Sequence, residues 1–477
     1  MENLRSAKMA TMPVKKLLIS MSLPAIFSML VQSIYNVVDS LYLAQYSSKA
    51  ITATGIVFPM QMLIVALGIG IGVGTNVYIS KSLGEGKRDR ASRAAQNGIF
   101  LALIAVVILV IVGFTAVKPF VRAFTNDKET ADMGIAYLSI CMIFSFGSMI
   151  ELTTSKILQA TGNMRVPMFT QLIGAVTNIV LDPFFIFGIG KMPRMGIKGA
   201  AIATVIGQCF AMIFSVCMLI FRKQDVHVLR RGFRPSYKFM WRILRVGLPS
   251  LLISALPSFT TIMVNSFIKN YDQAIAVLAV FFKLQSFVFM PVFGLTQGGM
   301  PIMSYNFGAY NRDRFSGTFR FMLILAVSYM LFGLILFQAI PYYLIRPFGD
   351  DPEFLRVGVY ALRTISICFL FAAVIICATT MMQALGRGFT SLLITLTRQL
   401  VIIPSAFLLA RYTGTKGVWF AYPIAEFTAT AVFLPISLLV FKRTFNKKRA
   451  EVQALREKEE AALDTPADKQ ESLGEQA

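Results

Sequence analysis

Long apolar runs, separated by short polar segments, recur along the chain from Leu17 to Phe441. Most runs reach the length of about 20 residues that an α-helix needs to cross the hydrocarbon core of a membrane. The pattern therefore predicts about twelve membrane-spanning helices. Their expected bounds are 17–43, 51–79, 95–117, 133–158, 167–190, 199–221, 243–269, 274–303, 317–340, 355–384, 391–411 and 417–441.

Composition supports an all-α integral membrane protein. Hydrophobic residues make up 56% of the chain and charged residues only 15%, whereas a soluble domain has roughly 25% charged residues. The net charge of +22 is spread over short segments between the apolar runs, so we do not expect nucleic-acid binding, which needs basic residues massed on one soluble face. His227 is the only histidine, which excludes a His-based zinc site and argues against an enzyme. We expect no cofactor.

The basic segments predict the orientation of the chain in the membrane. With twelve spans, one side carries the basic residues of 1–16, 81–93, 222–242, 312–314 and 442–449. Because positive charge is retained on the cytoplasmic side, both termini are expected there. The predicted protein is a multi-pass protein of the cell (inner or plasma) membrane, with a cytoplasmic N-terminus (1–16), a cytoplasmic linker (222–242) and a cytoplasmic polar tail (442–477).

Two halves of the sequence resemble each other at an offset of 224 positions. The repeat predicts an N-terminal lobe over 17–221 and a C-terminal lobe over 243–441, each with six helices. Because six is even, the two copies enter the membrane in the same direction, as a parallel repeat around a central cleft. The matching motifs are Ser80-x3-Gly84-x3-Arg88-Asp89-Arg90 with Ser304-x3-Gly308-x3-Arg312-Asp313-Arg314, and Gln159-Ala160-Thr161-Gly162 with Gln383-Ala384-Leu385-Gly386.

Ionisable residues inside predicted spans are candidates for function, since a buried charge is costly unless it is paired, hydrated or neutralised. Asp39 lies late in the first span, and Asp182 lies in the fifth with Asn178 one helical turn before it. Such a cluster can hold a proton or a small hard cation such as Na⁺. An alternative remains for Asp39, which lies about 33 Å of helix after Leu17 and so near the outer interface, where an acid is merely hydrated.

The second half carries one pair of opposite charges, Arg398 and Glu426, in neighbouring predicted spans. A structural salt bridge within the lobe is the favoured interpretation. A role in binding substrate or a proton is the alternative.

Several motifs, in this order on a doubled six-helix frame, resemble the multidrug and toxic-compound extrusion (MATE) family, bacterial type. The similarity covers roughly residues 15–441. The motifs that carry it are Pro24…Asp39, Gly72-x-Gly74-Thr75…Ser80-Lys81-x-x-Gly84, Gln159-Ala160-x-Gly162-Asn163, Asn178-x3-Asp182-Pro183 and Met290-Pro291-x-x-Gly294-Leu295-x-Gln297-Gly298.

The resemblance implies specific roles. Asp39, Asn178 and Asp182 would bind the coupling cation, H⁺ or Na⁺, with Thr204 as a possible additional ligand. Pro24 would let the first helix bend when its acid changes protonation; a static kink is the equal alternative. The second half lacks the acid that some relatives carry on the cleft side, so coupling is expected in the N-terminal lobe.

The expected function is that of a secondary multidrug efflux antiporter contributing to antibiotic resistance. It would export lipophilic, cationic small molecules in exchange for H⁺ or Na⁺, as a monomer in contact with membrane lipid. The alternative is a flippase for a lipid-linked precursor, which shares the parallel-bundle plan but favours a cationic cleft. Arg398 is the main arginine deep within a span.

Overall fold

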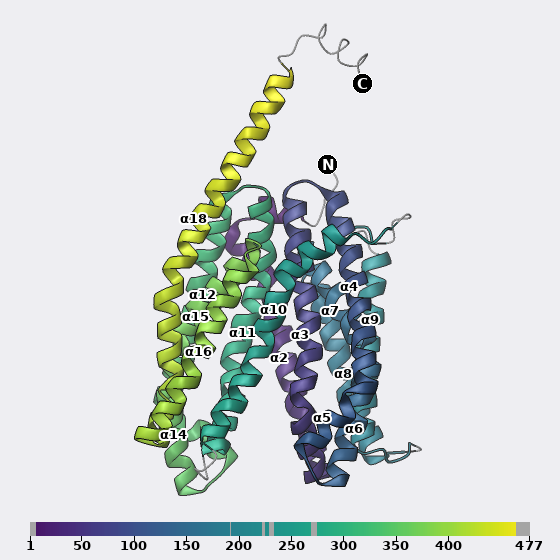
Figure 1. Cartoon of the computed structure of the whole chain (residues 1–477), viewed down its shortest axis with the longest axis vertical. Coiled ribbons are helices and arrows are strands. Elements are labelled where there is room, and N and C mark those ends of the chain that lie inside the picture. The colour runs from purple at the N-terminus through teal and green to yellow at the C-terminus, as the bar shows by residue number, and fades with distance from the viewer. Residues whose placement is uncertain (1–5, 191, 222–224, 229–232, 269–273, 464–477) are drawn as a thin grey trace.

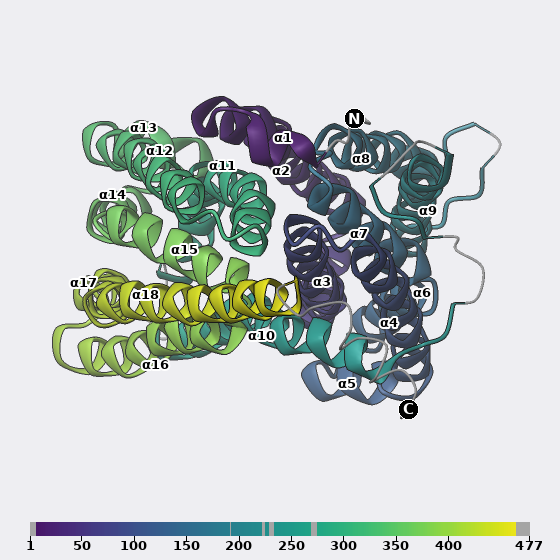
Figure 2. The ribbon, with the colours of Figure 1, turned by 90° about the horizontal axis from the view of Figure 1, so that it is seen from above.

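The computed structural model describes residues 6–190, 192–221, 225–228, 233–268 and 274–463, and within these ranges every regular element is helical. Two helical bundles stand side by side with their helices roughly parallel (Figure 1). Seen from above, α2 and α10 lie along the boundary between the bundles (Figure 2). The first bundle contains α1 (Ala7–Thr11), α2 (Val14–Tyr46), α3 (Ser48–Gly84), α4 (Arg88–Thr115), α5 (Val117–Phe124), α6 (Lys128–Ile143), α7 (Phe146–Ala160), α8 (Arg165–Phe187) and α9 (Ile197–Phe221).

The second bundle repeats this plan. It contains α10 (Tyr237–Ile268), α11 (Ala274–Gly308), α12 (Arg312–Ala339), α13 (Pro341–Ile345), the 3₁₀ turn η1 (Arg346–Phe348), α14 (Pro352–Ser366), α15 (Phe369–Ala384), α16 (Gly388–Thr413), α17 (Thr415–Val418) and α18 (Ala421–Leu463). We call the two bundles the N-lobe and the C-lobe.

The described helices account for the predicted spans. Ten single helices are long and apolar enough to cross a membrane, and two bent pairs bring the number to twelve if each pair is one span. The pairs are α6 with α7, bent by 48°, and α14 with α15, bent by 46°. The predictions of one helix over 133–158 and one over 355–384 were therefore wrong in detail, because each span is broken near its middle.

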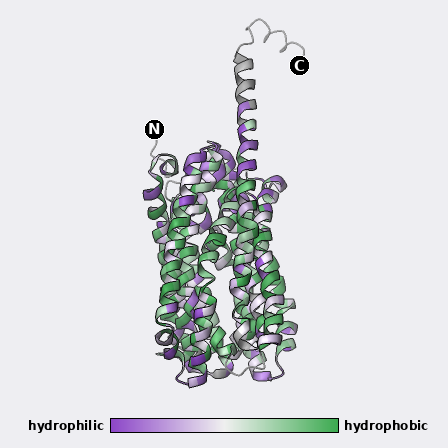
Figure 3. Cartoon of the chain, turned by 90° about the vertical axis from the view of Figure 1, so that its left-hand side faces the viewer, coloured by the Kyte–Doolittle hydropathy of each residue, from purple (hydrophilic) through white to green (hydrophobic). Residues whose placement is uncertain are grey.

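The outer surface of the bundles is apolar over most of its height, with polar residues gathered at the ends (Figure 3). Large apolar side chains stay exposed there, as at Phe332 (61%) and Leu400 (68%). A surface of this kind is stable in contact with lipid and would be unfavourable in water. The start of α1 and the C-terminal end of α18 lie at the same end of the molecule (Figure 1), which we call the terminal end; the opposite end is the far end.

The same hydrogen bond occurs once in each lobe. The Ser80 hydroxyl donates to the Ala160 carbonyl at 3.1 Å, and the Ser304 hydroxyl donates to the Ala384 carbonyl at 3.2 Å. Both members of the second bond lie 224 positions after those of the first (304 − 80 and 384 − 160). The parallel repeat predicted from sequence is thus present at the level of single contacts.

The lobes meet through a reciprocal contact at the terminal end. Gly84 of α3 lies against the Tyr305 carbonyl of α11, and Gly308 of α11 lies against the Lys81 carbonyl of α3. Since these residues are also 224 positions apart, the contact is the one that a twofold axis between the lobes produces. A side chain at either glycine would occupy the space of the opposite carbonyl oxygen, so only glycine permits this approach of the two backbones.

Gly84→Ala is expected to lower the stability of the protein by about 1–3 kcal/mol, because the added methyl group must push the two backbones apart. Gly55→Ala, in the same helix, is the matched control: no atom lies within 4 Å of its new Cβ, so its effect should be neutral or slightly stabilising. Thermal unfolding followed in detergent compares the two. Equal midpoints would contradict the close approach.

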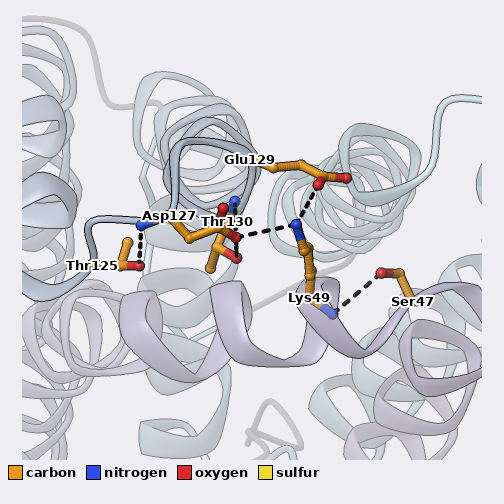
Figure 4. A network of polar contacts seen from close by, with 6 residues as sticks. All are labelled: Ser47, Lys49, Thr125, Asp127, Glu129 and Thr130. Carbon is orange, nitrogen blue, oxygen red and sulfur yellow. Dashed lines mark hydrogen bonds and ion pairs between the residues drawn. The ribbon is translucent and has the colours of Figure 1, made fainter.

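A charged network links the starts of α3 and α6 at the far end (Figure 4). The Lys49 ammonium lies 2.5 Å from Glu129 and 3.4 Å from Asp127. Asp127 also accepts hydrogen bonds from the Thr130 hydroxyl at 2.5 Å and the Thr130 amide at 3.3 Å, and these bonds lower the pKa of Asp127. About half of the Lys49 and Asp127 side-chain surface is exposed, so the network contributes little to stability.

Two polar segments differ from the sequence-based bounds. Helix α10 begins at Tyr237, inside the predicted linker 222–242, because apolar residues such as Phe239 and Trp241 alternate with basic ones and suit a helix passing through the membrane interface. Helix α18 continues past Phe441 to Leu463 without a break, through a stretch rich in the strong helix formers Ala, Glu, Lys and Leu. The linker residues 222–224 and 229–232 and the tail residues 464–477 lie outside the described residues.

Candidate functional site

The structure brings together the four residues proposed from sequence to bind a cation. Asp182 and Asn178 lie one turn apart on α8 and are buried, with 0% and 2% of their surfaces exposed. The Asn178 amide fits best with its nitrogen towards Asp182, donating to Oδ2 at 2.9 Å while its oxygen accepts from the Thr204 amide of α9 at 3.0 Å. The Thr204 hydroxyl donates to its own backbone, at the Ala200 carbonyl, at 3.0 Å.

Asp39 completes this group from the neighbouring helix α2. Its carboxyl group lies close enough to that of Asp182 for the two charges to interact. Its Oδ1 atom is buried and has no hydrogen-bond partner among the described residues. We call Asp39, Asn178, Asp182 and Thr204 the acidic cluster. Asp39 is thus partly buried, with one of its two carboxyl oxygens shielded from water.

Two carboxyl groups this close together cannot both carry a full charge at low cost. In the described part of the chain no basic side chain forms an ion pair with Asp39 or Asp182, so their mutual repulsion is not offset from within the protein. A shared proton, or a cation held between them, removes the repulsion. The arrangement is thus built to take up one positive charge.

The two carboxyl groups offer oxygen atoms as ligands, whereas the Asn178 oxygen is turned to the Thr204 amide and its nitrogen faces Asp182. Hard cations prefer such ligands, and a single proton needs only the two carboxyl groups. Across the described residues no group of three or more His, Cys, Asp or Glu side chains comes together to hold a metal ion. The chemistry of the cluster suits H⁺ or Na⁺ rather than a transition metal.

Further polar side chains surround the cluster, and sequence reasoning missed them. The Tyr35 side chain, one turn before Asp39 on α2, lies close to Asp39, Asp182 and Thr204. On the other side, Gln61 of α3 donates to the Tyr137 hydroxyl of α6 at 3.1 Å. Tyr35 could have been found from its i, i+4 spacing to Asp39, whereas nothing in the sequence places Gln61 and Tyr137 here.

Comparison with known proteins decides the family. The sequence model of the MatE family matches residues 24–184 and 247–408, one segment in each lobe. The chain belongs to the MatE family. The family and the fold predicted from sequence are confirmed, and the chain is a multi-span membrane protein of the MATE type.

Relatives of this MATE protein are similar over most of their length. The probable multidrug resistance protein NorM of Thermotoga maritima is 27% identical over 416 residues, covering 85% of this chain and 88% of NorM. The multidrug export protein MepA of Staphylococcus aureus is 26% identical over 432 residues, covering 90% and 94%.

Solved MATE structures show the same fold. The outward-facing conformation of a multidrug resistance MATE transporter of the MOP superfamily matches with a TM-score of 0.88 and 24% identity, covering 93% of this chain and 99% of that one. A MATE structure in a bent conformation matches with a TM-score of 0.87 and 25% identity, covering 93% and 99%.

Helix α2 of this MATE protein, which carries Asp39, contacts both lobes. It packs against α8 in its own lobe and against α11 in the other. Near Pro24 the Ser22 hydroxyl donates to the Leu295 carbonyl of α11 at 3.1 Å. Pro24 lies inside a helix that runs unbroken from Val14 to Tyr46, and its ring removes one backbone hydrogen bond next to this contact. The helix thus lacks one backbone hydrogen bond within its contact with α11, which extends past Pro24 to the Ser33 and Ser286 hydroxyls, 3.4 Å apart.

The C-lobe of this MATE protein contains the ion pair predicted from sequence. The Arg398 guanidinium of α16 is paired with the Glu426 carboxylate of α18, and only 5% of the Glu426 side chain is exposed. The Glu426 Oε2 and Arg398 Nε atoms have no hydrogen-bond partner in the described residues. The geometry is that of a salt bridge within one lobe.

A second buried pair of ionisable residues was missed from sequence. Glu151 and Lys156, both on α7 of the N-lobe, are 6% and 7% exposed. The Lys156 ammonium donates to the side-chain oxygen of Gln297 on α11 at 2.8 Å, so it joins the two lobes. Both residues interrupt a predicted apolar span, and that interruption was the available signal.

Proposed function

We propose that this MATE protein exports lipophilic, cationic small molecules in exchange for H⁺ or Na⁺ bound at the acidic cluster. The observation that carries the proposal is the proximity of the Asp39 and Asp182 carboxyl groups, with no ion pair to either among the described residues. The family supports it as well, because relatives such as NorM and MepA are named as multidrug resistance and multidrug export proteins.

The cation acts by removing a repulsion. When the cluster is empty, two negative charges push α2 away from α8; when a cation is bound, the two helices can pack. Because α2 also packs on α11 near Ser22, a change in its path reaches the lobe interface. The ion thereby favours one arrangement of the lobes, and the exported molecule, bound between them, favours the other.

The protein is placed in the cell membrane with both termini in the cytoplasm. The support is the charge pattern: basic residues concentrate at the terminal end, as at Lys81, Arg88 and Arg312, while the far end mixes Lys49 with Asp127 and Glu129. Retention of positive charge in the cytoplasm supports this orientation. The exported molecule therefore leaves at the far end, and the coupling cation enters from that end.

The flippase alternative is less well supported. It needs unpaired positive charge in the cleft to hold a diphosphate, and the main deep arginine, Arg398, is already paired with Glu426. Its charge is therefore not available to a lipid phosphate without breaking a buried ion pair.

Reconstituted vesicles test the proposal. Vesicles are loaded with a fluorescent cationic dye, and a pH gradient and a Na⁺ gradient are imposed separately. We expect one gradient to drive dye movement, and Asp39→Asn to abolish it. Asp350→Asn is the control, because the Asp350 side chain is 86% exposed and lies in the C-lobe. Undiminished transport by Asp39→Asn would remove Asp39 from the mechanism, and preferential movement of a lipid diphosphate would favour the flippase.

A further inference from the structure

A cavity of about 610 Å³ opens at the terminal end of the C-lobe, away from the acidic cluster. It lies between α12 and α18, both of which pack against or close to α15, and these three helices run together on the outer side of the C-lobe (Figures 1 and 2). Its wall combines apolar and charged side chains with Ser316 and Gly317. The apolar residues are Phe315, Phe319, Met381, Leu438 and Phe441; the charged ones are Arg312, Arg320 and Lys442 with the single acid Asp313.

The three basic side chains face one space. Arg312 and Arg320 lie on one face of α12, two turns apart with Ser316 between them, and Lys442 faces them from α18. Within the described ranges none of the three takes part in an ion pair. The Arg312 guanidinium lies over the Phe441 ring, 5.8 Å from its centroid. The cavity thus carries a net charge of +2 that the protein does not neutralise.

The depth of Arg320 indicates what would neutralise it. Arg320 is eight residues after Arg312, or about 12 Å further along the helix axis, inside an apolar span. Its side chain is exposed, at a height where the surface of a spanning helix faces lipid. A positive charge at that depth is costly unless it is paired with a negative group. A long arginine side chain can extend to the level of the lipid phosphates, which supply such a group.

The internal repeat shows how the fold treats the same groove in the N-lobe. The positions equivalent to Ser316 and Arg320 are Ser92 and Gln96 on α4, 224 positions earlier. There the chain covers the groove itself: the His227 amide donates to the Ser92 hydroxyl at 3.1 Å, and the Gln96 amide donates to the Val228 carbonyl at 2.9 Å.

The C-lobe differs in two ways. Helix α18 does not turn back after its span but continues outwards to Leu463 (Figure 1), so no described segment covers the groove on α12. In addition, the neutral Gln96 is replaced by the cationic Arg320. A groove that is filled by polypeptide in one lobe is open and positively charged in the other.

We propose that this cavity binds an anionic phospholipid. Its phosphate would lie among Arg312, Arg320 and Lys442, and an acyl chain would follow Phe319 and Leu438 along α12 and α18. A zwitterionic lipid fits less well, because its ammonium group brings a second positive charge to the same site. Basic pockets between membrane helices are known to recognise acidic headgroups.

Native mass spectrometry of the purified full-length chain tests the proposal. Phosphatidylglycerol and phosphatidylcholine with identical acyl chains are offered in competition. Since each basic residue near the headgroups adds about a fivefold preference for an anionic lipid, we expect the wild type to retain phosphatidylglycerol at least roughly tenfold better. The variant with Arg312→Gln, Arg320→Gln and Lys442→Gln should lose this preference.

The matched control removes the same charge from the equivalent end of the N-lobe, with Arg88→Gln, Arg90→Gln and Arg93→Gln, and should keep the preference. Ser316→Trp fills the cavity without changing any charge and should also lose the preference for phosphatidylglycerol. This second variant tests the cavity independently, in case the triple variant fails to fold. Equal retention of both lipids by the wild type, or a preference that survives both cavity variants, would overturn the proposal. Displacement of phosphatidylglycerol by millimolar inorganic phosphate would assign the site to a soluble anion instead.

Discussion

Asp182→Asn is expected to reduce gradient-driven dye export to the level of vesicles without protein, while leaving the fold at least as stable as the wild type. The asparagine keeps an acceptor oxygen for the Asn178 amide, which lies 2.9 Å from Asp182 Oδ2, so the packing of α8 is preserved. It can no longer take up a proton or contribute a charge to a bound cation. It also removes the repulsion from Asp39, which favours the folded state.

Two measurements on the same preparation separate function from folding. Transport is followed as dye fluorescence under the gradient that drives the wild type, and stability as the thermal unfolding midpoint in detergent. Asp350→Asn makes the same chemical change at an exposed site and should alter neither. A variant that loses transport only because its midpoint falls would show that Asp182 has a structural role.

Glu426→Leu is expected to lower the stability of the C-lobe by about 3 kcal/mol, because it leaves the Arg398 guanidinium without its partner inside the bundle. Part of the Arg398 side chain, 23%, remains exposed, which places the expected cost at the lower end for a broken buried pair. Thermal unfolding of the purified protein measures the effect.

The double variant with Arg398→Met and Glu426→Leu provides the control. Replacing both charges by apolar side chains of similar size restores most of the lost stability if the pair is structural. Transport by the double variant then decides its role. A stable double variant that transports normally supports the structural interpretation, and a stable one that cannot transport would show that the pair acts on the substrate or a proton.

The sequence was sufficient for the frame of the molecule. Apolar length and the repeat at 224 positions predicted the spans and the two lobes, because both depend on local composition and order. The acidic cluster could be proposed for the same reason: Asp39 and Asp182 stand out against an apolar background. Their proximity depends on how α2 packs on α8, which only the structure shows.

The misses have physical causes. Glu151 and Lys156 lie in a span whose average hydropathy stays high, so the span is recognised while its charges are overlooked. The residues between the paired helices, Phe144 and Ser145 in one span and Ile367 and Cys368 in the other, include neither proline nor glycine. Proline and glycine are the residues that most often mark the end of a helix in a sequence. Tyr137 and Gln61 lie on α6 and α3. Their place beside the cluster depends on how the helices of the lobe pack together, which the local sequence does not specify.

The reciprocal contact of Gly84 with Tyr305 and of Gly308 with Lys81 has an evolutionary consequence. A surface patch that meets its own copy across a twofold axis is isologous, the type of interface found in symmetric homodimers. A single lobe carrying this patch would be able to pair with a second copy of itself, and fusion of two such copies would give the arrangement seen here. Once fused, each half is free to diverge, which is consistent with the acidic cluster lying in one lobe and the Arg398–Glu426 pair in the other.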